Sequence, residues 1–463
     1  MKLKFKLILL CFTALLVIGC AEEKEKKNEM SQFKVPVEYY KLDNGLKVIL
    51  SQDSTSPTAI VAVYYNIGFR IEPKNRTGFA HLFEHMMFQG SKNLGKMEFV
   101  KLIQQNGGVL NGSTRFDFTN YFEIVPSHKL ETMLWAEADR MRGLDITQDN
   151  LTNQQGVVKN EVKVNVLNQP YGGFPWLDMP QYANTNWYNA HNFYGDLEDL
   201  DAANLEDVAS FFKTYYAPNN AAISIVGDFK TDETKEWIEK YFGNIPASSL
   251  PEKPDISEPR QTEEKEFVKN DSLANKPAIA LAYHMPQRNS QEYYAMGLLD
   301  QILVQGDNSL LAQKLVKDNG YTSNVNGGIN YLGNMFNYNG PMLWMYNLTY
   351  DKETSKADIL NAVEEVMAEL KTSISQEMID RAIVKIRSQL YDNIGGTFGL
   401  GRADLLCSFA LFDDDPARIN TLEEEFKKIS PEIVRSTIDE YLITSNRTVL
   451  EVNPLLADNE KTN

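Results

Sequence analysis

Two stretches far apart in the chain repeat the same pattern. Ala59–Tyr64 (AIVAVY) and Ala278–Tyr283 (AIALAY) are β-rich runs, and each precedes a helical stretch that runs up to a glycine, Gly90 or Gly306. Further helical stretches and a strand follow in both halves. A chain of 463 residues has room for two copies of an α+β unit of about 200 residues. We therefore predict a duplicated α+β fold, the alternative being a chance likeness between two short apolar runs.

Composition marks the borders of these units. Residues 247–264 are rich in Pro, Ser and Glu, which is typical of a linker. This predicts a first domain over residues 36–246 and a second over 265–457.

The two copies differ in their polar residues. Counted back from the two glycines, His81, Glu84 and His85 stand opposite Gly297, Asp300 and Gln301. The second copy is therefore predicted to be degenerate, because the histidines occur only in the first.

The N-terminal segment predicts an export signal. Lys2, Lys4 and Lys6 precede the apolar run Leu7–Gly19, which is too short to span a bilayer. The run ends in Val17-Ile18-Gly19-Cys20, which resembles the lipobox of bacterial lipoproteins. The resemblance implies that residues 1–20 are a lipoprotein signal peptide with its lipobox, and that Cys20 is lipidated and becomes the first residue after cleavage. An ordinary signal peptide with an incidental cysteine is the alternative.

Residues 21–35 are charged and predict a flexible tether. The expected location is the bacterial cell envelope, with the protein held by lipid at the periplasmic face or the outer membrane.

Charge excludes one class of partner. The formal net charge is −17, and no basic stretch offsets it. Such a surface repels phosphate backbones, so we expect no nucleic-acid partner.

The segment Phe79–Met87 carries the candidate chemistry. It predicts a helix with Thr77 as its N-cap, on which His81, Glu84 and His85 share one face. Neutral imidazoles suit zinc, and a carboxylate one turn away can take a proton from zinc-bound water. The order H-x-x-E-H is the inverzincin signature. Two interior histidines satisfied by neighbouring groups would be the structural alternative.

Zinc needs a third protein ligand, and spacing alone leaves several acidic residues open. The candidates are Glu98, Asp117, Glu123, Glu131, Glu137, Asp139, Asp145, Asp149 and Glu161.

A resemblance narrows this choice. The run Gly78–Asn93, the stretch Gly156–Glu161 and the stretch Asn168–Gly172 resemble the M16 metallopeptidases, the pitrilysin, insulin-degrading enzyme and mitochondrial processing peptidase family. The resemblance implies two LuxS/metallohydrolase-like α+β domains, each an antiparallel-rich sheet packed with helices, and one Zn²⁺ per chain. It assigns the third ligand to Glu161 and places Gln154 where the family often has a second glutamate.

The resemblance also implies substrate-binding residues. Asn111-Gly112-Ser113-Thr114 resembles the family's edge-strand stretch beside the zinc, which pairs with an extended peptide; a plain turn is the alternative. Lys314 and Tyr321 match the family's Arg/Tyr pair, although lysine lacks the bidentate fork of arginine.

We therefore expect a zinc endopeptidase in which Glu84 is the catalytic base. Its partners would be peptide substrates and a second M16-type subunit, in a homodimer or a heterodimer. A non-catalytic structural or substrate-presenting subunit of a peptidase complex is the second hypothesis, and a solute- or metal-binding lipoprotein the third.

Overall fold

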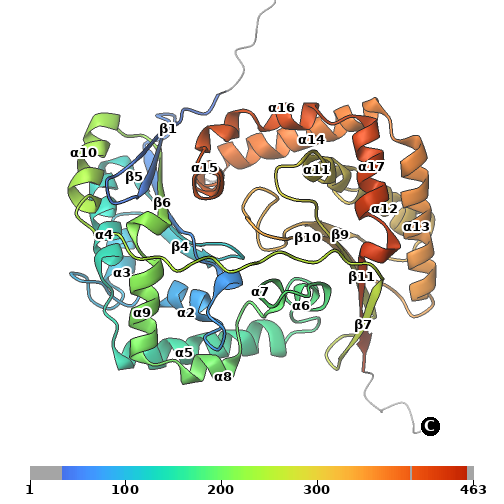
Figure 1. Cartoon of the computed structure of the whole chain (residues 1–463), viewed down its shortest axis with the longest axis horizontal. Coiled ribbons are helices and arrows are strands. Elements are labelled where there is room, and N and C mark those ends of the chain that lie inside the picture. Colours follow the sequence, from blue (N-terminus) through green and yellow to red (C-terminus); the bar gives the residue numbers. More distant parts are fainter. Residues whose placement is uncertain (1–33, 397–398, 456–463) are drawn as a thin grey trace, which may run out of the picture. The chain divides into compact units, whose positions relative to one another are not determined.

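Two sheets with related strand orders organise the chain (Figure 1). The computed structural model describes residues 34–396 and 399–455, and its part from Pro36 onward forms one compact unit. The predicted signal peptide, Cys20 and the tether up to residue 33 lie outside the described residues.

The first sheet has six strands in the order β1-β2-β6-β3-β5-β4. Strands β2 and β6 are parallel, and the other neighbours are antiparallel. The strands are β1 (Glu38–Lys41), β2 (Lys47–Gln52), β3 (Thr58–Tyr65), β4 (Val109–Thr114), β5 (Thr119–Pro126) and β6 (Ala221–Gly227).

The second sheet has five strands in the order β7-β11-β8-β10-β9. Strands β7 and β11, at one edge, are parallel, and the other neighbouring strands are antiparallel. The strands are β7 (Lys265–Asp271), β8 (Ala278–His284), β9 (Asn326–Ile329), β10 (Leu343–Thr349) and β11 (Arg447–Pro454). Without β1, the first sheet has the same order and directions, so the predicted duplication of an antiparallel-rich α+β unit is confirmed.

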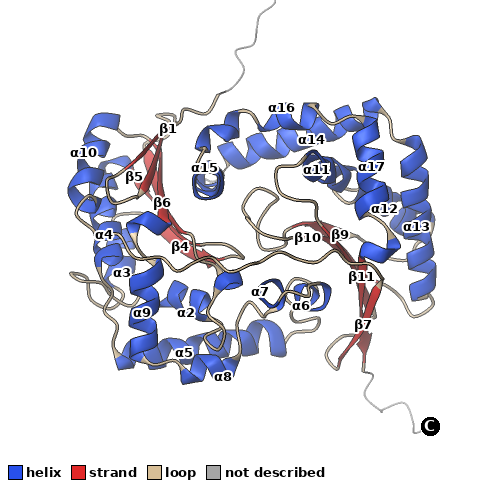
Figure 2. Ribbon diagram, viewed as in Figure 1, coloured by secondary structure: helices blue, strands red, loops and turns tan. Residues whose placement is uncertain are grey.

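Helices pack on the sheets in both halves (Figure 2). Those of the first half are α2 (Phe79–Met86), α3 (Glu98–Gln105), α4 (Leu130–Arg142), α5 (Gln148–Val162), α6 (Asp178–Ala183), α7 (Trp187–Ala190), α8 (Leu197–Ala202), α9 (Leu205–Tyr215) and α10 (Thr231–Phe242). Those of the second half are α11 (Gln291–Leu303), α12 (Leu310–Ala312), α13 (Lys356–Ser373), α14 (Gln376–Gly395), α15 (Leu400–Asp413), α16 (Leu422–Lys427) and α17 (Pro431–Tyr441). No regular element lies between Phe242 and Lys265, where the linker is predicted. Among the described residues, no helix combines the length and apolar character needed to cross a bilayer.

In each half, one helix packs against the sheet of the other half. Helix α15 of the second half packs against β2, β3 and β6, and its buried Cys407 points its sulfur at the carbonyl oxygen of Ala62, 3.7 Å away. Helix α6 of the first half packs against β8 and β11, where Met179 joins an apolar cluster with the alanines of β8. The two halves therefore depend on each other to bury their sheets.

This exchange makes a stability prediction. Met179 is fully buried between the halves, so Met179→Ala should lower the free energy of unfolding by about 2–5 kcal/mol, because it removes transfer energy and leaves a cavity. Urea titration followed by circular dichroism measures the loss. Val384→Ala on the exposed side of α14 is the control and should change stability by less than about 0.5 kcal/mol. Equal effects of the two substitutions would contradict the exchange.

Candidate metal centre

Helix α2 is held at its N-terminus by a buried carboxylate. The backbone N–H groups of Gly78 and Ala80 donate to Glu72, at 2.8 and 2.5 Å. Thr77 was predicted as the cap and is not; its hydroxyl instead donates to Asp199 at 2.7 Å, and Gly78 occupies the N-cap position. Glu72 thus fixes the helix end from which the candidate ligands project.

The predicted ligand atoms converge. His81 and His85 come from successive turns of α2, and Glu161 comes from α5, which packs beside α2. The two histidine Nε2 atoms lie 3.3 Å apart, and the Glu161 Oε2 atom lies 3.3 Å from His85 Nε2 and 3.7 Å from His81 Nε2. Among the described residues, this is the one group of His, Cys, Asp or Glu side chains that meets the geometry of a metal site.

These separations fit zinc. A tetrahedral centre with bonds of about 2.0–2.2 Å places its ligands about 3.3–3.6 Å apart. Burial lowers the pKa of His81 to about 4, so its imidazole is neutral and offers a lone pair. The hydrogen bond from His85 lowers the pKa of Glu161, so its carboxylate is charged. Two neutral imidazoles and one carboxylate form a donor set suited to Zn²⁺.

Several other candidate third ligands have different roles. Glu123 and Glu137 pair with the buried guanidinium of Arg140 in the core. Asp117 pairs with Arg70 at 2.7 Å, and Asp139 accepts hydrogen bonds from the loop after α2. Glu98 accepts a hydrogen bond from the backbone N–H of Gly95, just before its own helix, and Glu131 pairs with Lys240. Sequence spacing could not exclude these residues as the third ligand, because the partners that occupy their carboxylates are brought to them by the tertiary fold.

Glu84 lies against the edge of the first sheet. The Thr114 hydroxyl donates to its Oε2 at 2.8 Å. Burial raises the pKa of Glu84, and the Thr114 hydrogen bond opposes this shift. The strand approaches Glu84 closely at Gly112, where a Cβ atom would lie 3.3 Å from Glu84 Cγ and 3.2 Å from the Tyr121 ring. The carboxylate is thus held by one hydroxyl beside a strand whose edge is free.

Two aromatic residues that we had not assigned to the site complete one wall. The rings of Phe193 and Tyr194 each lie 5.2 Å from the His81 ring, and the Tyr194 hydroxyl lies 3.5 Å from Glu161. Their loop reaches α2 through Gly195, where a Cβ atom would lie 2.2 Å from Gly78 N. The segment 171–194 is rich in aromatic residues, and its sequence alone does not distinguish those that line the site from those that pack in the core.

The predicted substrate residues fall in different places. Asn111, Gly112 and Ser113 lie on β4, which among the described strands pairs only with β5 and leaves its other edge unpaired. Lys314 instead pairs with Glu365 of α13 at 2.6 Å, and Tyr321 packs against the core of the second half. Lys314 and Tyr321 therefore have their own contacts in the second half, and neither lines the described cavity beside β4.

The second half has helices equivalent to α2 and α5, but the residues at the equivalent positions are not metal ligands. Asp300 accepts a hydrogen bond from Trp344 Nε1 at 2.8 Å, and Gln301 donates to Gln389 Oε1 at 3.0 Å. Gln389 stands at the same position in α14 as Glu161 in α5. Amides replace both a histidine and the third ligand, as expected for a degenerate copy.

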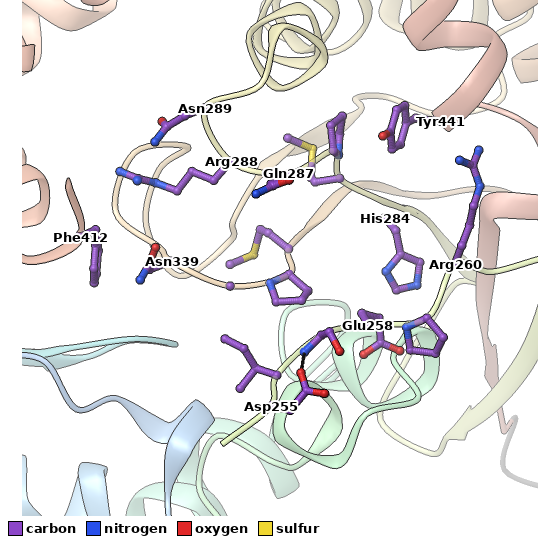
Figure 3. A pocket seen from close by; sticks show the side chains of 18 of the residues that line it. Asp255, Glu258, Arg260, His284, Gln287, Arg288, Asn289, Asn339, Phe412 and Tyr441 are labelled. Carbon is purple, nitrogen blue, oxygen red and sulfur yellow. Dashed lines mark hydrogen bonds between the residues drawn. The ribbon is translucent and has the colours of Figure 1, made fainter. Parts of the chain in front are cut away.

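A separate cavity of about 860 Å³ lies between the linker and the second half (Figure 3). Arg288, on its wall, pairs with Asp413 at 2.6 Å, and His284 Nε2 lies 3.2 Å from the carbonyl oxygen of Ala183. Among the described residues lining it, no group of metal-binding side chains converges. Among the described residues, the candidate metal centre therefore lies at α2 and α5 and not in this cavity.

Comparison with known proteins agrees with this geometry. A family model described as insulinase (peptidase family M16) matches residues 47–186, and a model described as the peptidase M16 inactive domain matches residues 202–385. Together the two models match more than half of the chain, with the ligand-bearing segment in the first.

Relatives and solved structures extend the match. Zinc protease PqqE of Helicobacter pylori is 30% identical over 282 residues, which cover 59% of this chain and 62% of that protein, so the match spans less than two thirds of its length. The beta subunit of the mitochondrial-processing peptidase of Bos taurus is 23% identical over 89% of this chain and 84% of its own. The crystal structure of a protease from Helicobacter pylori has a TM-score of 0.82 at 23% identity, covering 91% of this chain and all of that one.

Proposed function

The chain belongs to peptidase family M16, and on that premise we propose that it is a zinc-dependent endopeptidase acting on peptides or unfolded protein segments. One observation carries the proposal: the tetrahedral spacing of His81, His85 and Glu161, with Glu84 on the same face of α2.

Each residue has a distinct task in this proposal. His81, His85 and Glu161 would hold one zinc ion, which supplies Lewis-acid chemistry by lowering the pKa of water and polarising a peptide carbonyl. Glu84 accepts the proton of the attacking water and later delivers it to the leaving amine. Thr114 orients the Glu84 carboxylate through its 2.8 Å hydrogen bond. The free edge of β4 aligns an extended peptide through main-chain hydrogen bonds.

The second hypothesis, a non-catalytic subunit, has less support. Such a subunit needs neither the base nor the third ligand, yet both are in place here, and Glu84 is held by Thr114. The match of the second half to an inactive-domain model concerns residues 202–385, outside the ligand-bearing helices.

We also propose a second M16-type subunit as partner. The relative from Bos taurus is itself named as a subunit. Because Lys314 is engaged by Glu365 within its own chain, a facing copy or a related subunit would supply the missing substrate-binding groups.

Anchoring of the protein to the bacterial envelope through Cys20 belongs to the same proposal. It is supported by the apolar run Leu7–Gly19 that ends at this cysteine.

The direct test combines metal analysis with digestion of a complex peptide mixture. We expect about one zinc per chain, and cleavage that stops on addition of a chelator and returns with zinc. Mass spectrometry of the products identifies the cut bonds. A metal-free preparation, or cleavage that a chelator leaves unchanged, would contradict a zinc endopeptidase.

A further inference from the structure

A cavity of about 430 Å³ lies beside β4 on the face of the sheet opposite α2. Successive side chains of a strand point to opposite faces. Thr114 accordingly faces α2 and bonds to Glu84, whereas Asn111, Ser113 and, just beyond the strand, Arg115 line the cavity. The cavity is therefore separated from the catalytic carboxylate by the thickness of one strand.

The second half forms the far wall of this cavity. This wall consists of the loop around Asn334 and Asn337, the end of α14 and the start of α15. Asp404 of α15 accepts a hydrogen bond from Tyr64 of β3 at 2.9 Å, which ties this wall to the first sheet. An extended peptide on β4 would therefore direct alternate side chains toward α2 and into this cavity.

The acceptor atoms on the wall are already engaged. Besides Tyr64, Asp404 lies within hydrogen-bonding distance of the side-chain amides of Asn334 and Asn337, and burial raises the pKa of its carboxyl. The side-chain amide oxygens of Asn111, Asn120, Asn334 and Asn337 also each accept a hydrogen bond from within the protein. The exceptions are Asp392 and Asn393, which lie on the solvent-exposed part of α14.

Donor atoms are free by contrast. Among the described residues, the Arg115 guanidinium, which carries five N–H donors, makes no hydrogen bond or ion pair. Its positive charge acts at longer range on two carboxyl groups, lowering the pKa of Asp404 and of Glu84 against the effect of their burial. Asn120 is only 6% exposed and lines the cavity, and its side-chain NH₂ donates to no described group. The Asn111 side-chain NH₂ is free in the same way. A half-buried cation with two free amide donors, next to engaged acceptors, fits a carboxylate.

We propose that this cavity is a specificity subsite that takes an acidic side chain of the substrate, with Arg115 as its ion partner. The inference rests on the proposed peptidase function. Arg115 acts in it as a specificity-determining residue, whereas the zinc ligands and Glu84 would serve every substrate.

The size of the preference follows from the bond formed. Hydrogen bonds to charged groups are stronger than neutral ones, which corresponds to a preference of about 10- to 100-fold in kcat/KM for Glu over Gln at one substrate position. Lysine at that position would face the Arg115 charge and be cleaved more slowly than glutamine.

The test uses quenched peptides that differ by Glu, Gln or Lys at one position, scanned on both sides of the scissile bond. The parent protein should favour Glu at one position. Arg115→Gln should remove that preference, Arg115→Lys should keep part of it, and Arg115→Glu should make Lys the favoured residue. A gain of Lys preference requires a folded enzyme, so it separates altered specificity from misfolding. Arg381→Gln, in an exposed ion pair with Glu377 on α14, is the control and should keep the parent preference.

Several results would overturn the subsite. One is a parent enzyme that does not favour Glu at any position, and another is a Glu preference that survives Arg115→Glu. A uniform loss for all three peptides in Arg115→Gln would also overturn it, because the Arg115 charge also lowers the pKa of Glu84 and that result would place its effect on the catalytic base. If no peptide is cleaved in a chelator-sensitive way, the proposed function fails and the subsite fails with it. If peptides are cleaved in a chelator-sensitive way but without a charge preference, the subsite proposal fails and the proposed peptidase function stands.

Discussion

Glu84→Gln should abolish peptide cleavage while zinc binding persists. Glutamine keeps the shape of glutamate and can still accept the Thr114 hydrogen bond through its amide oxygen. It cannot take a proton from water at neutral pH, and loss of a general base costs about 10²- to 10⁴-fold in rate. Burial already disfavours the charge of Glu84, so a neutral amide should be tolerated by the fold.

Turnover of a quenched peptide at equal zinc content measures this effect. The matched control is Glu198→Gln, an exposed carboxylate on α8 outside the site, which should cleave at the parent rate. If Glu84→Gln cleaved as fast as the parent protein, Glu84 would not be the base. If this variant lost zinc, the result would identify Glu84 as a zinc ligand.

The sequence was informative about α2 because its chemistry is local. His81, Glu84 and His85 share a face wherever a helix forms, so the convergence of the two imidazoles could be predicted. The cap was missed because Thr77 is a common N-cap residue, whereas the observed cap uses the side chain of Glu72, six residues before the N-cap position Gly78. Its carboxylate reaches Gly78 and Ala80 through a turn that residue preference does not encode.

Glu161 illustrates a second limit. No periodicity relates α5 to α2, and nine acidic residues were open until the family resemblance selected one. The structure places Glu161 Oε2 within 3.7 Å of both histidines. The neighbouring Tyr194 was missed because it reaches the site through a close approach between Gly78 and Gly195 that only the tertiary fold creates.

The exchanged helices show what a repeat leaves undetermined. Two copies of a unit predict two sheets, but not which helix covers which sheet. Helix α15 is apolar on most of its surface and could pack against either sheet as far as its sequence shows. Because it packs on the first sheet and carries Asp404 to Tyr64, the second half forms a wall of the cavity beside β4.

Glu161→Gln should lose zinc, in contrast to Glu84→Gln. The charged oxygen 3.3 Å from His85 Nε2 would become a neutral amide atom, leaving two imidazoles as the strong ligands. Changes to groups that merely support ligands weaken metal binding by about 10- to 100-fold, so removing a ligand charge should cost at least about 100-fold. Competition with a chromogenic chelator measures the affinity, and peptide cleavage should fall with zinc occupancy.

The increase in Tm on addition of zinc measures the loss of zinc affinity independently. Zinc that binds only the folded state should raise the Tm of the parent protein and of Glu84→Gln by similar amounts. Glu161→Gln should show little shift at the same zinc concentration, while Gln154→Ala, on the same helix but outside the ligand cluster, should retain zinc affinity. If Glu161→Gln bound zinc as tightly as the parent, another residue would have to be the third ligand. Because the alternatives Asp117, Glu123 and Asp139 are held by partners of their own, the structure provides no substitute among them.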